Sequence, residues 1–424
     1  MNSDLHLPFP EWVPKEIVAG YRDKGVEGLF HWQHEILNAA TETNENVIYA
    51  APTSAGKSLV AELLALYAAL HEKKSFFVLP YVAVAKEKLH QLQKIWRRID
   101  LQVAGFMGHQ SAERNDWMCA VCTIEKANSL VNRMITEDTV EDLGVIVLDE
   151  LHMVNEGSRG TTYEFFIAKV LFLREHNSAA RIVAMSATLS NTSKIETWLG
   201  SSVYQTNFRP VDLIETIAIE NDLCDINGDN KIRELPNEFR SFAQDYDRML
   251  GWTVEALCSG NLCLVFCSSK AEVEKVAVEI ARIIAGLLPT KSELKSVIDR
   301  SALTELKTEM ERIGPIDPLL VKTLPRGIGF HHAGLTAEER ECLENFFRRG
   351  IIRLLVATST LSSGVNLPAN KVIIRAQTRG PTAINSMTYK QMAGRAGRMG
   401  HANKVGGTLS STCIQLDRVF KSAP

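Results

Sequence analysis

The 424-residue chain is long enough for roughly two or three domains, and 45% hydrophobic with 23% charged residues is the composition of an ordinary globular protein. Its net charge of −3 provides no overall attraction to nucleic acid, so any such binding must use a local groove. No apolar run approaches the length of a membrane span, and residues 1–12 lack the regions of a signal peptide, so we expect neither a membrane protein nor a secreted one.

A first series of short apolar segments alternates with helical ones. Residues 46–52 (NVIYAAP) precede a predicted helix at 57–74 (KSLVAELLALYAALHEKK). Short apolar segments separated by helices are typical of parallel strands that are buried on both faces. The pattern therefore predicts an α/β domain. The further strand candidates of this series read SFFVLP, MCAVCTIE, LGVIVLDE and RIVAMSAT.

The eight cysteines are scattered, and Cys119 and Cys122 form the one CxxC of the sequence. A CxxC is a candidate zinc or redox site, but no second CxxC completes a set of four ligands. The surrounding MCAVCTI reads as a buried strand, which favours core thiols in a reducing, intracellular compartment.

A second series of apolar segments predicts a second parallel sheet. We place the boundary near residue 210, which gives domains at 1–210 and 211–424. The polar, acidic stretch 219–238 is predicted to be a loop-rich surface segment. Apolar residues at helical spacing predict a helical insert at about 287–323. The strands of the second series read LCLVFCSS, GIGFHHAG, IIRLLVATST and NKVIIRAQ, and the insert carries Leu294, Ile298, Leu303, Leu306 and Met310.

Residues 51–58 (APTSAGKS) fit the phosphate-binding loop, with alanine in place of the first glycine. Small residues expose backbone N–H groups to phosphates at the positive end of the following helix. Lys57 would reach the β- and γ-phosphates, and the Ser58 hydroxyl would bind Mg²⁺. The strand–loop–helix context favours this interpretation over a chance Gly/Ser turn. The predicted ATP-binding residues of this loop are Ala51, Pro52, Thr53, Ser54, Ala55, Gly56, Lys57 and Ser58.

Two acidic residues, Asp149 and Glu150, follow the apolar strand VIVL, at the sheet edge where ligands bind in such folds. Asp149 suits a Mg²⁺ ligand, and Glu150 suits the orientation or deprotonation of an attacking water. Alone, such a pair is as often a helix cap, but after a phosphate-binding loop it indicates an ATPase. The segment Ser186–Thr188, also at a strand end, gains weight only from its place in this series.

In this order, PTSAGKS, DELH, SAT and QMAGRAGR resemble the motifs of superfamily 2 helicases. LPYVAVAKEK, CTIEKANSLVNRMI, DELHMVNEGSRG, FHHAGLTAEER and ATSTLSSGVNLPA resemble the branch that contains the polymerase theta and helicase Q helicases. The resemblance implies an α/β fold of two tandem RecA-like domains, each a mostly parallel sheet flanked by helices. It also implies ATP and Mg²⁺ as cofactors.

The resemblance also assigns residues to the nucleotide. Arg395 and Arg398 match arginine fingers, which stabilise the charge of the transferring phosphate. Gln391 matches a sensor on the same segment, and Gln33 resembles an adenine-reading glutamine. A Gly-rich turn with solvated arginines is the less favoured alternative. Gly364 and Asn366 complete the expected ATP-binding set.

In this family, loops at strand ends grip the sugar-phosphate backbone of a single strand, and hydroxyls and amides suffice for that. Each such residue could also be a cap or turn. Because a backbone grip does not identify the sugar, single-stranded DNA is the expected partner and RNA the alternative. The expected contacts are Pro80, Tyr81, Lys86, Gly108, Thr123, Asn128, His332, Thr358 and Thr360.

After Gly400 the family pattern stops, leaving an unmatched tail at 401–424 without the winged-helix and ratchet regions. We expect an ATP-dependent DNA helicase or translocase of the nucleus, acting in double-strand-break or replication-fork repair. The alternatives are an RNA helicase of the same superfamily and a non-catalytic ATP-gated clamp. Lys57, Glu150 and Arg398 together disfavour the clamp.

Overall fold

A boundary between Phe208 and Arg209 divides the chain into two units, Met1–Phe208 (unit 1) and Arg209–Pro424 (unit 2). The structure is a computed structural model. It describes residues 6–108, 116–155, 157–176, 180–187, 189, 192–243, 245–362, 367, 369–375, 386–396, 403–405 and 408–416.

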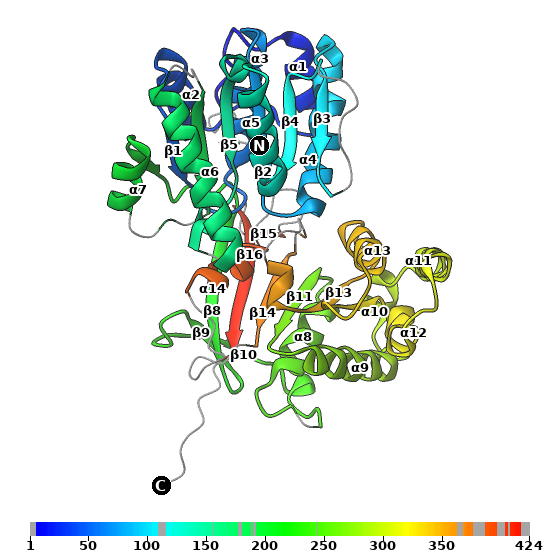
Figure 1. Cartoon of the computed structure of the whole chain (residues 1–424). Helices are drawn as coiled ribbons and strands as arrows, with labels where there is room; N and C mark the ends of the chain where they lie inside the picture. The colour runs from blue at the N-terminus through cyan, green and yellow to red at the C-terminus, as the bar shows by residue number, and fades with distance from the viewer. Residues whose placement is uncertain are drawn as a thin grey trace. The chain divides into compact units, whose positions relative to one another are not determined.

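Unit 1 is built on a seven-stranded parallel sheet with the strand order β3-β4-β2-β5-β6-β1-β7 (Figure 1). Its strands are β1 (Val47–Ala50), β2 (Lys74–Leu79), β3 (Val103–Phe106), β4 (Cys119–Thr123), β5 (Leu143–Leu148), β6 (Arg181–Ser186) and β7 (Val203–Gln205). Its helices are α1 (Lys15–Arg22), α2 (His31–Glu42), α3 (Lys57–Leu70), α4 (Val82–Trp96), α5 (Ile124–Thr136), α6 (Gly157–Glu175) and α7 (Thr192–Leu199), with short 3₁₀ turns at η2 (Arg97–Ile99), η3 (Val140–Asp142) and η4 (Leu151–Asn155).

Both faces of this sheet are buried, because successive strand residues point in opposite directions. Tyr49 and Phe77 belong to a core that also takes in residues of α1 to α4. Their neighbours Ile48 and Phe76 belong to a second core, which takes in residues of α5, α6 and α7. The strands are therefore mostly apolar on both faces, as expected for a parallel sheet between two helical layers.

Unit 2 contains a nine-stranded sheet with the order β10-β9-β8-β16-β14-β11-β13-β12, and β15 pairs with β16. Its strands are β8 (Asp212–Ile219), β9 (Asp222–Asp225), β10 (Lys231–Glu234), β11 (Cys263–Cys267), β12 (Ile328–His331), β13 (Leu354–Thr358), β14 (Lys371–Ile374), β15 (Asn403–Val405) and β16 (Thr408–Leu416). In the spatial order from β8 through β16, β14, β11 and β13 to β12, every neighbouring pair is parallel. The pairs β8–β9, β9–β10 and β15–β16 are antiparallel. The sheet is thus mostly parallel, as predicted.

Several helices of unit 2 begin at side chains that cap them. Ser269 accepts a hydrogen bond from the Glu272 N–H at the start of α9, and Thr336 and Glu339 form a capping box at the start of α13. The helices are α8 (Met249–Cys258), α9 (Lys270–Leu287), α10 (Ser292–Val297), α11 (Arg300–Ile313), α12 (Pro318–Thr323), α13 (Ala337–Arg348) and α14 (Ser386–Ala393), with 3₁₀ turns at η5 (Asn237–Phe239), η6 (Leu324–Arg326) and η7 (Ser359–Ser362).

The predicted helical segment at about 287–323 is confirmed as α10, α11 and α12. In α11, Leu303, Leu306 and Met310 are all buried, as their helical spacing indicated. The strand candidates of both series are also confirmed. Cys119 and Cys122 are fully buried in β4, and no cluster of metal-binding side chains occurs among the residues that the structure describes.

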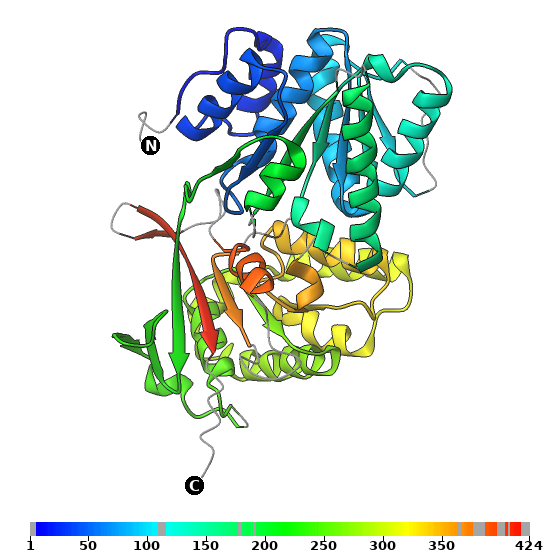
Figure 2. The ribbon, with the colours of Figure 1, turned by 60° about the vertical axis from the view of Figure 1, so that its left-hand side comes forward.

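Several strands of unit 2 were not predicted. The stretch 219–238 is not only loop, because it contains β9 and β10, which form an antiparallel meander with β8. β10 is a sheet edge with mostly exposed residues, so polar side chains concealed the strand. The tail after Gly400 contains β15 and β16, and β16 lies between β8 and β14 within the sheet (Figure 2). The edge strands β3 and β7 of unit 1 were also missed.

Among the helices in the described ranges, none combines the length and the apolar character needed to cross a bilayer.

Candidate functional site

The loop between β1 and α3 makes a sharp turn that only particular backbone conformations allow. Gly56, which begins α3, has φ +85°, and Ser54 has φ +74°. A side chain at position 56 would also place its Cβ 2.4 Å from Gln33 Nε2. Position 56 therefore requires glycine both for its backbone conformation and for space. The first turn of α3 follows directly, so the backbone N–H groups of a helix N-terminus lie beside this turn.

Gln33 holds this turn in place. Its Oε1 accepts a hydrogen bond from the Phe30 N–H at 2.8 Å, and its Nε2 donates to the Gly56 carbonyl at 2.9 Å. The residue is 1% exposed, so its amide acts within unit 1 as a clamp between the start of α2 and the phosphate loop. The predicted adenine-reading residue thus lies directly beside the predicted phosphate site.

Lys57 lies within the loop that precedes it. Its Nζ donates to the carbonyls of Ala51 at 2.8 Å and Pro52 at 3.1 Å. The Tyr49 hydroxyl, buried beneath the loop, donates to the Lys57 carbonyl at 2.8 Å. The Ser54 hydroxyl is buried and has no hydrogen-bond partner among the described residues. A cation, an unused hydroxyl and a helix start together form a donor set that fits a polyphosphate.

Asp149 and Glu150 follow β5, at the same carboxyl edge of the sheet. The Glu150 N–H donates to Asp149 Oδ1 at 2.9 Å, and Glu150 has φ +53°. Such a backbone costs about 1–3 kcal/mol for a residue other than glycine and is common at functional sites. Burial, reinforced by the negative charge of Glu150, raises the pKa of Asp149 to about 7, although Lys57 and Lys88 act in the opposite direction. A bound divalent cation would favour the ionised form of this carboxylate, which fits the predicted Mg²⁺ role of Asp149.

His152 connects the acidic pair to the next strand. Its Nδ1 lies 3.2 Å from Glu150 Oε2 and forms a hydrogen bond with Ser186 Oγ at 3.0 Å. His152 and Ser186 are both buried, on η4 and at the end of β6 respectively. Within the segment Ser186–Thr188, the serine is therefore linked to Glu150 through His152. Thr188 lies outside the described residues.

Two predicted nucleic-acid residues, Pro80 and Tyr81, contact an arginine to which the sequence pattern assigned no role. The Arg159 guanidinium lies 5.5 Å from the centre of the Tyr81 ring and donates to the Pro80 carbonyl at 3.2 Å. Its Nε also lies 3.4 Å from Glu125 Oε1. Lys86 is exposed on α4, one turn from Tyr81. The signal for Arg159 was a lone arginine between small residues, directly after the acidic motif.

The neighbouring candidates lie on α5. Thr123 begins this helix and is 6% exposed. Asn128 Oδ1 accepts a hydrogen bond from Lys169 Nζ at 2.5 Å, and Asn132 Oδ1 accepts one at 2.6 Å. Lys169, on α6, is a second cation that the sequence analysis missed, since nothing in its local sequence distinguishes it. Gly108 is exposed after β3, with φ +55°.

In unit 2 the structure describes the side chains of two predicted nucleic-acid residues, His332 and Thr358. His332 is 4% exposed, and its Nε2 lies 3.0 Å from Glu274 Oε1 while its Nδ1 accepts from the Gly334 N–H. Both ring nitrogens of His332 therefore already have partners, so only its backbone remains for a contact with a nucleic-acid strand. Thr358 ends β13 and is 9% exposed.

Gln391 lies on α14, and Arg395, on the turn after it, is 8% exposed. The Arg395 carbonyl accepts from the Ala369 N–H at 3.1 Å, which fixes this turn beside β14. Gly364, Asn366, Arg398 and the Thr360 side chain lie outside the described residues.

A buried ion pair links α3, the helix that follows the phosphate loop, to α4. Lys88 Nζ on α4 lies 2.6 Å from Glu62 Oε1 on α3, and the Tyr21 hydroxyl donates to Glu62 Oε2 at 2.9 Å. Burial alone would lower the pKa of Lys88, but the Glu62 carboxylate outweighs it and raises the pKa. The pair joins the helix of the phosphate loop to the helix that begins at Tyr81. No local sequence pattern predicted this ion pair, because its two residues are far apart in the chain.

Two family models match the chain. "DEAD/DEAH box helicase" matches residues 30–195, and "Helicase conserved C-terminal domain" matches residues 303–400. DNA polymerase theta of Caenorhabditis elegans is 46% identical over 401 residues, which cover 93% of this chain and 24% of that protein.

This chain matches a larger share of two relatives that are less similar in sequence. Human "Helicase POLQ-like" is 36% identical over 393 residues, covering 89% of this chain and 35% of that protein. "ATP-dependent DNA helicase Hel308" of Pyrococcus abyssi is 32% identical over 426 residues, covering 97% and 55%. The chain therefore spans between a quarter and just over half the length of these three relatives. A crystal structure of the DUF1998 helicase MrfA bound to DNA has the same fold, with TM-score 0.69, 19% identity, and coverage of 97% of this chain and 52% of that one.

Proposed function

Because this chain belongs to the superfamily 2 helicases, with a DEAD/DEAH box domain followed by a conserved C-terminal helicase domain, we propose that it is an ATP-driven motor that moves along single-stranded DNA. The proposal assigns residues 1–210 to an ATP-binding RecA-like domain and 211–424 to a C-terminal RecA-like domain. The observation that carries it is the convergence of Lys57, Asp149, Glu150 and His152 at one edge of the unit 1 sheet.

The nucleotide roles follow from that edge. Lys57 and the backbone of residues 51–58 bind the phosphates, and Gln33 reads the adenine beside them. Ser58 and Asp149 hold Mg²⁺, which supplies charge neutralisation at the phosphates. Glu150 accepts the proton of the attacking water, oriented by His152. Gly364, Asn366, Gln391, Arg395 and Arg398 contribute from unit 2, where the arginines stabilise the charge that develops on the γ-phosphate.

The nucleic-acid roles rest on residues at the carboxyl edges of the two sheets. Tyr81, with Arg159 against its ring, offers a stacking or phosphate contact, and Thr123, Asn128, Thr358 and Thr360 offer hydroxyl or amide donors. Contacts of this kind need no overall positive charge, which is compatible with a chain whose net charge is −3. Lys86 and the backbone of Pro80, Gly108 and His332 complete the contact set.

DNA is favoured over RNA because the relatives whose names state a nucleic acid are a DNA polymerase and a DNA helicase. From the similarity to DNA polymerase theta we extend the proposal to DNA repair, at double-strand breaks or replication forks, and to a location in the nucleus. Since the chain covers only part of each relative, the processes of the whole proteins come to this chain as part of the proposal.

An ATPase assay with single-stranded DNA, single-stranded RNA or no nucleic acid tests this function. We expect turnover to rise with DNA and to fall steeply as salt increases, because phosphate contacts release counterions. Glu150→Gln serves as the inactive control that still binds nucleotide. Greater stimulation by RNA would identify an RNA helicase instead. Nucleotide-dependent DNA binding without turnover would identify a clamp.

A further inference from the structure

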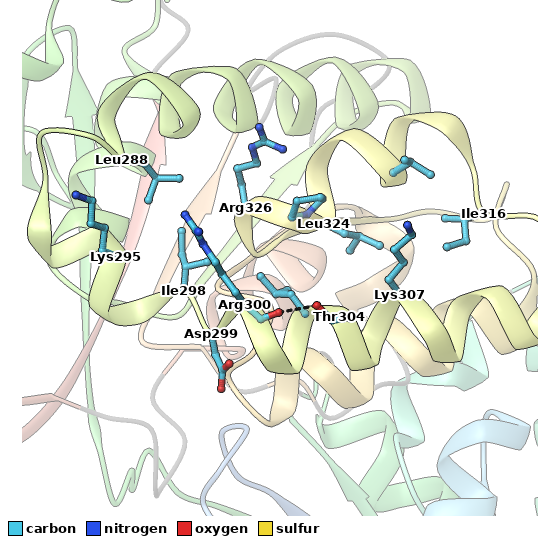
Figure 3. Close-up of a pocket in the computed structure, with 13 residues that line it drawn as sticks. Leu288, Lys295, Ile298, Asp299, Arg300, Thr304, Lys307, Ile316, Leu324 and Arg326 are labelled. Atoms are coloured by element: carbon cyan, nitrogen blue, oxygen red, sulfur yellow. Dashed lines mark hydrogen bonds between the residues drawn. The ribbon is translucent and has the colours of Figure 1, made fainter.

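A pocket of about 810 Å³ lies in the helical insert of unit 2, apart from every residue assigned above. Its volume is within the range of about 300–1,000 Å³ that is typical of ligand sites. Figure 3 shows its wall, formed by the end of α9, by α10, α11 and α12, and by η6. We call it the insert pocket, and it is lined by Leu288, Lys295, Ile298, Asp299, Arg300, Leu303, Thr304, Lys307, Ile316, Val321, Leu324, Pro325 and Arg326.

The floor of the insert pocket is aliphatic. Leu303 and Leu324 are 5% and 3% exposed, so they also belong to the unit 2 core. Val321 is 47% exposed and leaves an apolar edge open to water. No aromatic ring and no histidine lines the space. Burial of aliphatic side chains of an occupant against this floor would therefore stabilise the complex.

The rim of the insert pocket is basic. Its lining carries the four cations Lys295, Arg300, Lys307 and Arg326 and, among the described side chains, one carboxylate, that of Asp299. Lys307 Nζ also lies 3.6 Å from Glu311 Oε1, which is outside the lining. Asp299 is already used, since its Oδ1 accepts hydrogen bonds from Ser301 N and Ala302 N and caps α11. In Figure 3 its carboxylate points away from the side on which the Arg300 and Lys307 side chains extend. Where side chains are described, no carboxylate lies within ion-pair distance of Arg300 or Arg326.

We propose that the insert pocket binds an acidic, leucine-containing helical peptide segment of a partner protein. Its aliphatic side chains enter the floor formed by Leu303, Val321 and Leu324, and its carboxylates pair with the cations of the rim. The charge complementarity is specific to the rim, because the chain as a whole is slightly acidic. An amphipathic helix in an apolar groove with charged flanks is an established mode of peptide recognition.

The arrangement of the cations favours a peptide over a small anion. Arg300 and Lys307 are seven positions apart on α11, so their Cα atoms are separated by two turns, about 10 Å along the axis. A single phosphate requires donors that converge on one point, whereas separated carboxylates on a helix match separated cations. The N-terminus of α11, which could otherwise bind an anion, is occupied by Asp299. The Thr304 hydroxyl is bonded to the Arg300 carbonyl at 2.9 Å.

The chemistry of the floor disfavours a nucleic acid in the same place. Proteins that bind single strands combine basic grooves with aromatic side chains on which bases stack. The insert pocket has the cations without the rings, and its aliphatic floor suits leucine side chains instead.

Fluorescence anisotropy with three synthetic peptides of about 16 residues tests the proposal on the full chain. The acidic probe carries leucines at positions i, i+3 and i+7 with glutamates on both flanks. The second probe replaces each glutamate by lysine, and the third replaces each leucine by alanine. We expect saturable binding of the acidic probe, with the other two at least about tenfold weaker. Equal binding of all three, or no binding of the acidic probe, would overturn the proposal.

Two charge-reversal variants locate the binding. Arg300→Glu/Arg326→Glu should weaken the acidic probe at least about tenfold and strengthen the lysine probe. Arg312→Glu is the matched control, because this exposed arginine lies on the same helix outside the pocket lining. Unchanged melting temperature and ATPase activity would show that the double variant is folded. If it does not fold, Lys295→Glu/Lys307→Glu makes the same test from the exposed rim.

The same variants distinguish the other occupants. Inorganic phosphate and a short single-stranded DNA serve as competitors of the acidic probe. We expect neither to displace it at concentrations that leave ionic strength unchanged. DNA binding that is lost in Arg300→Glu/Arg326→Glu would make the pocket part of the nucleic-acid path and would reject a peptide site, as would an acidic probe that binds the double variant as well as it binds the wild type.

Discussion

His152 Nδ1 and Ser186 Oγ lie 3.0 Å apart, which ties the turn that carries Glu150 to the carboxyl end of β6. Because His152 also lies 3.2 Å from Glu150 Oε2, one buried imidazole contacts two motifs that are separated by more than thirty positions in the chain. A displacement of β6 would therefore move the residue that we assign to water activation.

Ser186→Ala should lower the ATPase kcat roughly three- to tenfold while the nucleotide affinity stays unchanged. The substitution removes one hydrogen bond, with a net value of about 1 kcal/mol, that orients His152 against Glu150. Steady-state kinetics would separate kcat from KM. Ser193→Ala, at an exposed position on α7, is the control. A change confined to KM would contradict an orienting role.

Lys57→Ala should abolish hydrolysis and weaken nucleotide affinity, because the phosphates lose the cation inside the loop. We expect turnover to fall at least about a hundredfold. Lys94→Ala, at an exposed position on α4, should leave turnover unchanged. Wild-type turnover in Lys57→Ala would rule out the assigned phosphate-binding loop.

Glu150→Gln should separate binding from chemistry. The amide keeps the size of the side chain and the backbone at φ +53° but cannot accept a proton. Binding of a fluorescent nucleotide should persist, while phosphate release falls by about 10²–10⁴. Loss of binding in parallel with turnover would mean that Glu150 has a structural role.

Arg398→Ala should spare ATP binding and lower kcat by about 10³–10⁵, since an arginine finger acts mainly on the transition state. The matched control is Arg282→Ala, an exposed arginine on α9 paired only with Glu279 among the described residues. Single-turnover measurements would isolate the chemical step. An unchanged kcat would reject the assignment of Arg398.

Lys88→Met should lower the free energy of unfolding of unit 1 by about 3–5 kcal/mol, because it leaves the Glu62 carboxylate buried without its cation. The double substitution Glu62→Gln/Lys88→Met should recover much of that loss. Urea unfolding would measure both. A single variant as stable as the wild type would show that the pair contributes no net stability.

The parts of the site that sequence predicted share one property. Lys57 follows β1, and Asp149 and Glu150 follow β5. Both are mostly buried parallel strands, so the strand pattern and the chemical motif indicated the same place. Arg159 and Lys88 were missed because their roles depend on partners that folding brings together, Tyr81 and Glu62. His332 was placed in the right turn, but its ring faces Glu274 instead of solvent.

The missed strands have a common physical cause as well. β10 is exposed at a sheet edge, so it lacks the apolar run by which β5 and β11 were recognised. β16 follows two consecutive glycines and contains several polar residues, and its place in the sheet depends on β8 and β14, which contribute the hydrogen bonds on either side. Local periodicity carries no information about such distant pairing.

The pairing of β8 with β16 has a consequence for how the protein is made. Asp212 is in register with Ser410, so during synthesis the meander β8–β10 leaves the ribosome well before its partner strand. At about 5–20 residues per second this interval is roughly 10–40 s. Throughout it, the backbone edges of β8 and β14 have no strand between them. The sheet between β8 and β14 can close only once β16 has been made, and until then these two open strand edges can pair with other chains.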